Sequence, residues 1–126
     1  TTIVDDIVKN GGKAATFSFD ILNPDISSVF ISTNNWQPTH LYYFATPFIF
    51  SGEREVFSSQ IFSDFCDYYI KGFMNTLNTL SSSQIKNIFY PSSVAIDEIP
   101  TNMGEYTSAK MASEMLCQYL EKMMTC

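Results

Sequence analysis

The feature that most constrains the fold is an alternation of short apolar runs with longer segments whose apolar residues recur every three or four positions. Short runs typical of buried strands are Lys13–Ile21, His40–Ala45 and Ile85–Ser93. Helical patterns cover Thr2–Lys9, Asp25–Thr33, Val56–Leu80 and Glu105–Met124. This order of elements predicts an α/β fold with a parallel sheet and right-handed crossovers.

Two of these segments carry more detailed expectations. The run that begins at His40 is continuously apolar, which favours a strand buried on both faces, and Pro47 should end it. The wide apolar stripe of Val56–Leu80 has two interpretations, because it could pack on the sheet or pair with the last helix against a second subunit. In that last helix the residues expected to face inward are Ala112, Met115, Leu116, Tyr119 and Met123.

Composition excludes several classes of protein. The chain has 126 residues and a net charge of −6 without a cluster of Lys or Arg, so we expect a single domain that does not bind nucleic acid. No apolar run approaches the roughly 18 residues of a membrane span. His40 is the single histidine, and Cys66, Cys117 and Cys126 lack metal-ligand spacing, so we expect no metal site. Free thiols indicate a cytoplasmic setting.

One constellation of polar residues follows the third predicted strand. Tyr106 and Lys110 lie one helical turn apart, and Ser93 stands at the end of the strand before them. Ligands of open α/β sheets bind beyond the carboxyl ends of the strands. A nearby ammonium favours the ionised form of a phenol, so this set could exchange a proton with a carbonyl or alcohol. By itself, however, a Tyr and a Lys at this spacing occur by chance in many helices and usually mark a surface tyrosine beside a solvated lysine.

The order of these pieces resembles the central part of a short-chain dehydrogenase/reductase. The segment "EYTSAKMASEMLCQYLE" is similar to that family's active-site helix, and Ser93 precedes Tyr106 by the family's usual thirteen residues. The segment "IKNIFYPSSVA" resembles the strand that precedes this helix in the family, and "FCDYYIKGF" resembles the start of the family's long interface helix. The segment "VDDIVKNGGKAATFSFDILNPD" resembles the family's helix, Gly-Gly turn and strand, which end in an aspartate that contacts adenine.

The resemblance implies a Rossmann-like, three-layer fold of which residues 1–126 form a partial NAD(P)-binding domain. It assigns Tyr106 as the catalytic acid and base, Lys110 as the residue that assists it and binds the nicotinamide ribose, and Ser93 as the holder of the substrate oxygen. The cofactor would be NAD or NADP, and the implied contacts are Asp20, Ile21, Ala45, Thr46 and Lys110. From the residues alone, Asp20 could equally cap the turn before Pro24.

The chain also departs from the family pattern. It contains no Gly-rich cofactor loop, it has Phe44–Pro47 where the family has Asn-Asn-Ala-Gly, and Tyr69 stands where an Asn often completes the catalytic set. We therefore expect the isolated chain to bind cofactor weakly or not at all, and to belong to a longer protein or a homo-oligomer. The predicted activity is nicotinamide-dependent reduction of a small carbonyl compound or oxidation of an alcohol. The alternatives are a catalytically degenerate relative that serves binding or assembly, and an epimerase- or dehydratase-like relative.

Overall fold

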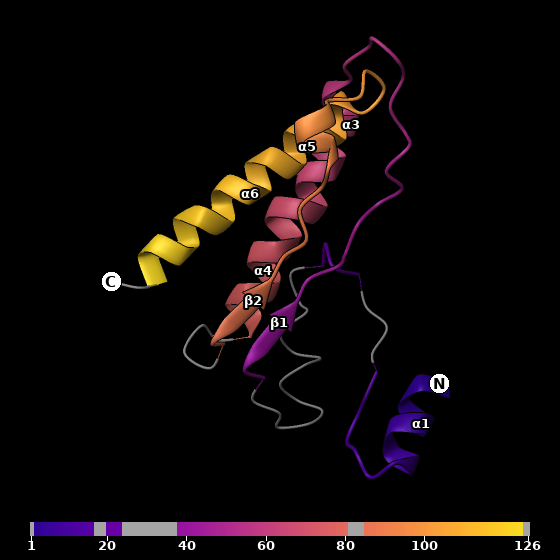
Figure 1. Ribbon diagram of the computed structural model, residues 1–126, viewed down its shortest axis with the longest axis vertical. Helices are drawn as coiled ribbons and strands as arrows, with labels where there is room; N and C mark the ends of the chain where they lie inside the picture. The colour runs from indigo at the N-terminus through magenta and orange to yellow at the C-terminus, as the bar shows by residue number, and fades with distance from the viewer. Residues whose placement is uncertain (1, 17–19, 24–37, 81–84, 125–126) are drawn as a thin grey trace.

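The computed structural model describes residues 2–16, 20–23, 38–80 and 85–124, and these form a mixed α/β structure (Figure 1). Its elements in chain order are α1 (Thr2–Lys9), β1 (His40–Tyr42), α3 (Ser59–Cys66), the π-helical turn η1 (Asp67–Gly72), α4 (Phe73–Thr79), β2 (Asn87–Phe89), α5 (Ala95–Glu98) and α6 (Gly104–Met124). The α3–η1–α4 helix and α6 run side by side, and the two strands lie against the α4 end of this pair.

The sheet has two parallel strands within the described residues, which confirms the predicted parallel pairing of these two runs. His40 pairs with Asn87 and Tyr42 pairs with Phe89. One more bond, from the Tyr43 amide to the Phe89 carbonyl at 3.1 Å, continues the ladder past the end of β1. The strands are shorter than predicted, at three residues each, and Pro91, two residues past β2, has no N–H to extend the pairing.

The two faces of this sheet differ in their surroundings. Tyr43 is buried in a cluster with Phe73 and Leu77, against which Leu41, Ile88, Tyr90, Leu116, Cys117 and Leu120 pack. Tyr42, Phe44 and Phe89 point away from the helices and are more than half exposed. The described residues therefore form two layers, and the expectation of a strand buried on both faces is wrong for them.

The long helical pattern of Val56–Leu80 is confirmed as one continuous helix, α3–η1–α4, that begins at Ser59. It starts three residues late because Ser58 is the N-cap, whose hydroxyl accepts a hydrogen bond from the Ile61 amide at 3.2 Å. The core of its apolar stripe is buried within this chain, at Phe65, Tyr69, Phe73 and Leu77. The stripe thus packs on the sheet, as the first interpretation predicts, and it also contacts the last helix, α6, within the same chain.

The π-helical turn η1 is tied to the sheet by two tyrosines. The Tyr43 hydroxyl, just past β1, donates a hydrogen bond to the Tyr68 carbonyl. The Tyr90 hydroxyl, just past β2, donates to the Tyr69 carbonyl at 2.7 Å. Both acceptors lie where i→i+5 bonding interrupts the regular helical ladder. Burial raises the pKa of both tyrosines, so each hydroxyl keeps the proton that it donates.

Helix α6 matches the predicted segment, but its inward face was predicted wrongly. The residues that face the core are Tyr106, Ala109, Lys110, Ser113, Leu116, Cys117 and Leu120. Of the expected inward residues only Leu116 lies on this face, whereas Ala112, Met115, Tyr119 and Met123 are exposed. The error arose because α6 is apolar on both sides, and the polar residues Lys110 and Ser113 occupy buried positions.

In the N-terminal third, the structure confirms the elements predicted from the sequence only in part. Helix α1 has its predicted bounds, and Gly11, with φ of 87°, ends it, but α1 buries none of its side chains. The strand predicted over Lys13–Ile21 is wrong for the described residues 13–16, 20 and 21, while 17–19 and the predicted helix Asp25–Thr33 lie outside the described residues. Between β2 and α6 the chain forms the short helix α5, which ends at Ile99 in the left-handed region.

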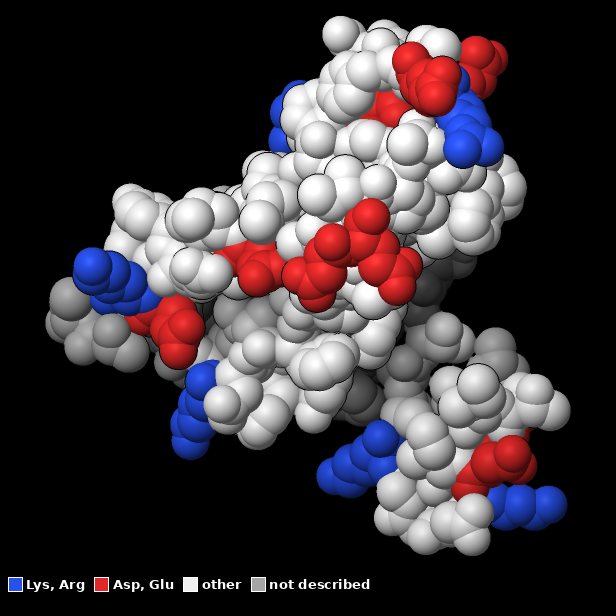
Figure 2. All heavy atoms as spheres, turned by 45° about the horizontal axis from the view of Figure 1, so that its top comes forward, with Lys and Arg blue, Asp and Glu red and all other residues white. Residues whose placement is uncertain are grey.

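Two further observations concern the charged side chains on the surface and the length of the helices. Figure 2 shows one group of acidic side chains in the middle of the face in view, and further acidic side chains beside Lys and Arg side chains toward its margins. No helix in the described part of the chain is both long and apolar enough to cross a bilayer.

Gly72 in η1 allows the Tyr43 hydroxyl to approach the helix. A Cβ at Gly72 would lie 2.8 Å from that hydroxyl oxygen and 3.2 Å from the Asp67 carbonyl oxygen. We expect Gly72→Ala to lower the free energy of unfolding by about 1–2 kcal/mol, despite the higher helix propensity of alanine. Chemical denaturation measures this. Gly104→Ala is the matched control, because its Cβ would meet only Phe57 at 3.5 Å. A neutral Gly72→Ala variant would contradict the account.

Candidate functional site

A small cleft opens beyond the carboxyl ends of both strands, where a ligand of a parallel sheet is expected. Its volume is about 240 Å³. The walls come from the segment after β1, from η1, from the segment after β2 and from α6. The lining residues are Tyr43, Phe44, Ala45, Thr46, Ile49, Tyr69, Pro91, Ser92, Tyr106 and Lys110.

Lys110 places an ammonium in the wall of this cleft. The side chain is only 7% exposed. Its Nζ donates a hydrogen bond to the Pro91 carbonyl at 3.0 Å and lies 4.2 Å and 5.1 Å from the ring centroids of Tyr69 and Tyr90. Burial lowers the pKa of the Lys110 ammonium below its ordinary value of 10.5, and nearby Cys117 acts in the opposite direction.

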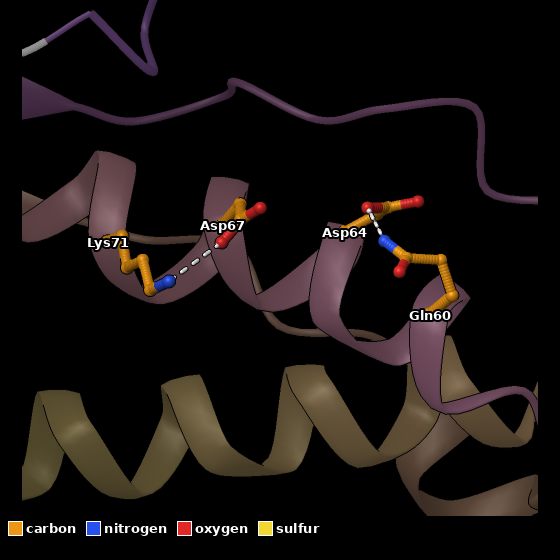
Figure 3. A network of polar contacts seen from close by, with 4 residues as sticks. All are labelled: Gln60, Asp64, Asp67 and Lys71. Atoms are coloured by element: carbon orange, nitrogen blue, oxygen red, sulfur yellow. Dashed lines mark hydrogen bonds and ion pairs between the residues drawn. The ribbon is translucent and has the colours of Figure 1, made fainter.

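No carboxylate among the described residues lies within ion-pair distance of Lys110. An ion pair elsewhere in the described residues joins Lys71 and Asp67, with Nζ 3.2 Å from Oδ1, and the Lys71 side chain is largely exposed. Figure 3 shows this pair and the 3.0 Å hydrogen bond from Gln60 to Asp64 following one another along the α3–η1 helix. The positive charge of Lys110, in contrast, is compensated in part by a carbonyl and two aromatic rings.

Tyr106 lies one turn before Lys110 on α6 and is 8% exposed. Its ring packs edge-on against Phe65 and Tyr69, with centroids 5.6 Å and 6.0 Å away. The start of α6 is fixed by Glu105, because its buried carboxylate Oε2 accepts a hydrogen bond from the Ser58 amide at 2.8 Å. The beginnings of α3 and α6 are thus joined beside Tyr106.

Tyr69 and Thr46 meet at the cleft, a contact that was not predicted from the sequence. Their hydroxyl oxygens are 2.6 Å apart. Burial raises the pKa of Tyr69, and the hydrogen bond with Thr46 acts in the opposite direction. Both residues belong to departures from the family pattern, and the structure joins these departures in one contact. No local pattern indicates the pair, because the contact joins residues 23 positions apart on two different elements.

The structure brings four of the predicted site residues together, namely Ala45, Thr46, Tyr106 and Lys110. Ser93 is not among the residues that line the cleft. Its Oγ accepts a hydrogen bond from the Ala95 amide at 3.2 Å, at the start of α5. The neighbouring Ser92 lines the cleft instead, and its hydroxyl donates to Glu114 Oε2 at 2.9 Å.

Asp20 and Ile21 lie away from the cleft lining. The Asp20 carboxylate accepts a hydrogen bond from the Leu22 amide at 3.0 Å, which is the turn-capping alternative considered from the sequence. Ile21 is half-buried against the cluster of Tyr43 and Phe73. In this arrangement neither residue contacts the site of Tyr106 and Lys110.

The remaining candidates in the described residues are one histidine and two cysteines. His40 is exposed at the start of β1, with Nδ1 2.9 Å from the Thr39 hydroxyl and Nε2 3.3 Å from the side-chain amide nitrogen of Asn87. Cys66 and Cys117 are free, half-buried thiols. Within the described ranges, no three His, Cys, Asp or Glu side chains come together as a metal site. A second groove of about 540 Å³ lies between β2 and α6, and Ile88 and Leu120 are among its lining.

Comparison with known proteins adds no family: the chain matches no protein-family model, and no curated protein sequence is significantly similar to it.

The contact of Thr46 with Tyr69 predicts coupled stability effects. In a double-mutant cycle of Thr46→Val and Tyr69→Phe, we expect a coupling energy of about 1 kcal/mol, because each substitution removes the same hydrogen bond. Chemical denaturation of the four proteins measures it. The control cycle pairs Thr46→Val with Tyr42→Phe, whose ring packs on Phe89, and should be additive. Equal values in the two cycles would disprove the contact.

Proposed function

We propose that this chain carries the reaction centre of a nicotinamide-dependent oxidoreductase that reduces a small carbonyl compound or oxidises an alcohol. The observation that carries the proposal is the placement of Tyr106 beside a buried Lys110 ammonium, in a cleft at the carboxyl ends of two parallel strands. The spacing of Tyr106 and Lys110 is common in helices, but here both side chains line the same cavity. It supports the resemblance to the short-chain dehydrogenase/reductase family.

The proposal extends to the fold. The parallel pairing of β1 and β2, with helices on one face, is the part of a Rossmann-like, three-layer domain that this chain would supply. The exposed face of the sheet, at Tyr42, Phe44 and Phe89, is where the third layer would pack.

In the proposed reaction Tyr106 moves the proton. Its hydroxyl protonates the oxygen of a carbonyl substrate during reduction and takes the proton back from an alcohol during oxidation. The Lys110 ammonium favours negative charge on the oxygens around it, and the low dielectric of the site strengthens this effect. Ser92 lines the cleft and Ser93 does not, but the Ser92 hydroxyl donates its proton to Glu114, so Tyr106 is the hydroxyl donor to the substrate oxygen.

The cleft fits one end of a nicotinamide cofactor. Lys110 has donors for ribose hydroxyls, and Ala45 and Thr46 border the same space. When bound, NAD or NADP supplies the hydride chemistry. A volume of about 240 Å³ is too small for a whole dinucleotide, and Asp20 and Ile21 do not line it, so other residues must hold the adenine end.

A second candidate is a catalytically degenerate relative that binds a ligand or assembles. Two contacts favour it: the Ser93 hydroxyl is used by the backbone of α5, and Tyr69 bonds to Thr46 at 2.6 Å in the cleft. The proposed setting for either function is a cytoplasmic homo-oligomer or longer chain. The exposed apolar side chains of α6, at Met111, Met115, Tyr119 and Met123, suit a contact with a second copy.

The test uses the full natural chain that contains these residues. We expect NADH or NADPH to bind, as detected by its fluorescence, and a panel of small aldehydes and ketones to be reduced. Tyr106→Phe should lower turnover by about 10²–10⁴-fold with little change in cofactor affinity, because only the proton donor is lost. Tyr119→Phe, on the exposed face of the same helix, is the matched control. The proposal fails if neither cofactor binds at millimolar concentration, or if Tyr106→Phe turns over normally.

A further inference from the structure

The buried ammonium of Lys110 has a property that proton transfer does not use. It sits in the wall of an open cleft without a counter-ion from the described residues. A buried charge is costly unless another charge or several hydrogen bonds compensate it. The Pro91 carbonyl takes one of its three donors, and the rings of Tyr69 and Tyr90 compensate it in part. An anion in the cleft would complete the compensation.

The other walls indicate what kind of anion fits. Tyr43, Phe44, Ile49 and Pro91 offer aromatic and aliphatic surface, and Tyr106 offers a phenol that can donate a hydrogen bond. The hydroxyls of Thr46 and Ser92 already donate their protons, to the Pro47 carbonyl at 3.0 Å and to Glu114 at 2.9 Å. No Asp or Glu is among the lining residues. The cleft thus combines one buried cation, one phenol donor and an apolar wall.

We propose that this cleft is a binding site for a small organic carboxylate with a short aromatic or aliphatic body. The ammonium of Lys110 is the counter-ion, the hydroxyl of Tyr106 donates a hydrogen bond to a carboxylate oxygen, and the apolar wall holds the body. The volume of about 240 Å³ limits the ligand to a small molecule. The net charge of −6 opposes non-specific uptake of anions, so binding would have to come from the local site. The inference uses the same cleft as the proposed reaction but does not require hydride transfer.

Benzoate is the probe, titrated into the full natural chain without cofactor and followed by calorimetry. We expect saturable binding at one site, and binding of the neutral, similarly shaped benzamide at least about tenfold weaker, because only benzoate pairs with the ammonium. Lys110→Met should weaken benzoate at least about tenfold. The matched control, Lys86→Met, removes the same charge from an exposed position in the second groove and should leave the affinity unchanged.

Two-dimensional amide NMR spectra of the unmodified protein locate the site without any variant. We expect benzoate to shift the amides of Thr46, Ser92 and Tyr106. Shifts centred on Ile88 and Leu120 in the second groove would overturn the assignment. So would equal affinity for benzoate and benzamide, no binding of benzoate, or normal benzoate binding by a folded Lys110→Met protein.

The outcomes also separate this inference from the proposed function. If benzoate does not bind while cofactor binding and the loss of turnover in Tyr106→Phe are observed, the carboxylate site is wrong and the oxidoreductase proposal stands. If benzoate binds through Lys110 and neither nicotinamide cofactor binds, the carboxylate site stands and the oxidoreductase proposal is wrong.

Discussion

The structure depends on the attachment of a π-helical turn to the ends of two parallel strands. The Tyr43 and Tyr90 hydroxyls reach from the residues just past β1 and β2 to the carbonyls of Tyr68 and Tyr69. These bonds satisfy acceptors in a turn where the helical ladder is interrupted, and they are possible because Gly72 has no side chain in the path of Tyr43. The helix is consequently fixed in register with the sheet at the level where the cleft opens.

The cleft follows from this attachment. With η1 in place, the ring of Tyr69 lies beneath the Lys110 ammonium, and its hydroxyl meets Thr46 on the segment after β1. The start of helix α6 is held by a separate contact, because the Glu105 carboxylate accepts a hydrogen bond from the backbone amide of Ser58. An ammonium, a phenol and further hydroxyls therefore share one small space, although they come from four separate segments. The proposed proton transfer and the proposed carboxylate site are two uses of that arrangement.

Sequence periodicity was sufficient for the elements that pack against each other. The long helix of Val56–Leu80 and the last helix were predictable from apolar spacing, and the parallel pairing was predictable from the alternation of strands and helices. The inward face of α6 was not, since Lys110 and Ser113 are polar residues at buried positions. Tyr106, Lys110, Ala45 and Thr46, which spacing and resemblance predict as site residues, line one cleft. The contact of Tyr69 with Thr46, and the use of Ser93 by α5 in place of the cleft, depend on tertiary geometry that no local pattern encodes.

The central claim is that Lys110 is a buried ammonium facing the cleft beside Tyr106. The most direct test is an NMR titration of Lys110 in protein labelled with ¹³C at the lysine ε carbon, assigned through Lys110→Met. The account predicts a pKa below the ordinary value of 10.5, because burial disfavours the charged form. Addition of benzoate should raise this pKa, because a bound anion favours the ammonium. A Lys110 pKa at or above 10.5 that does not respond to benzoate would contradict the account.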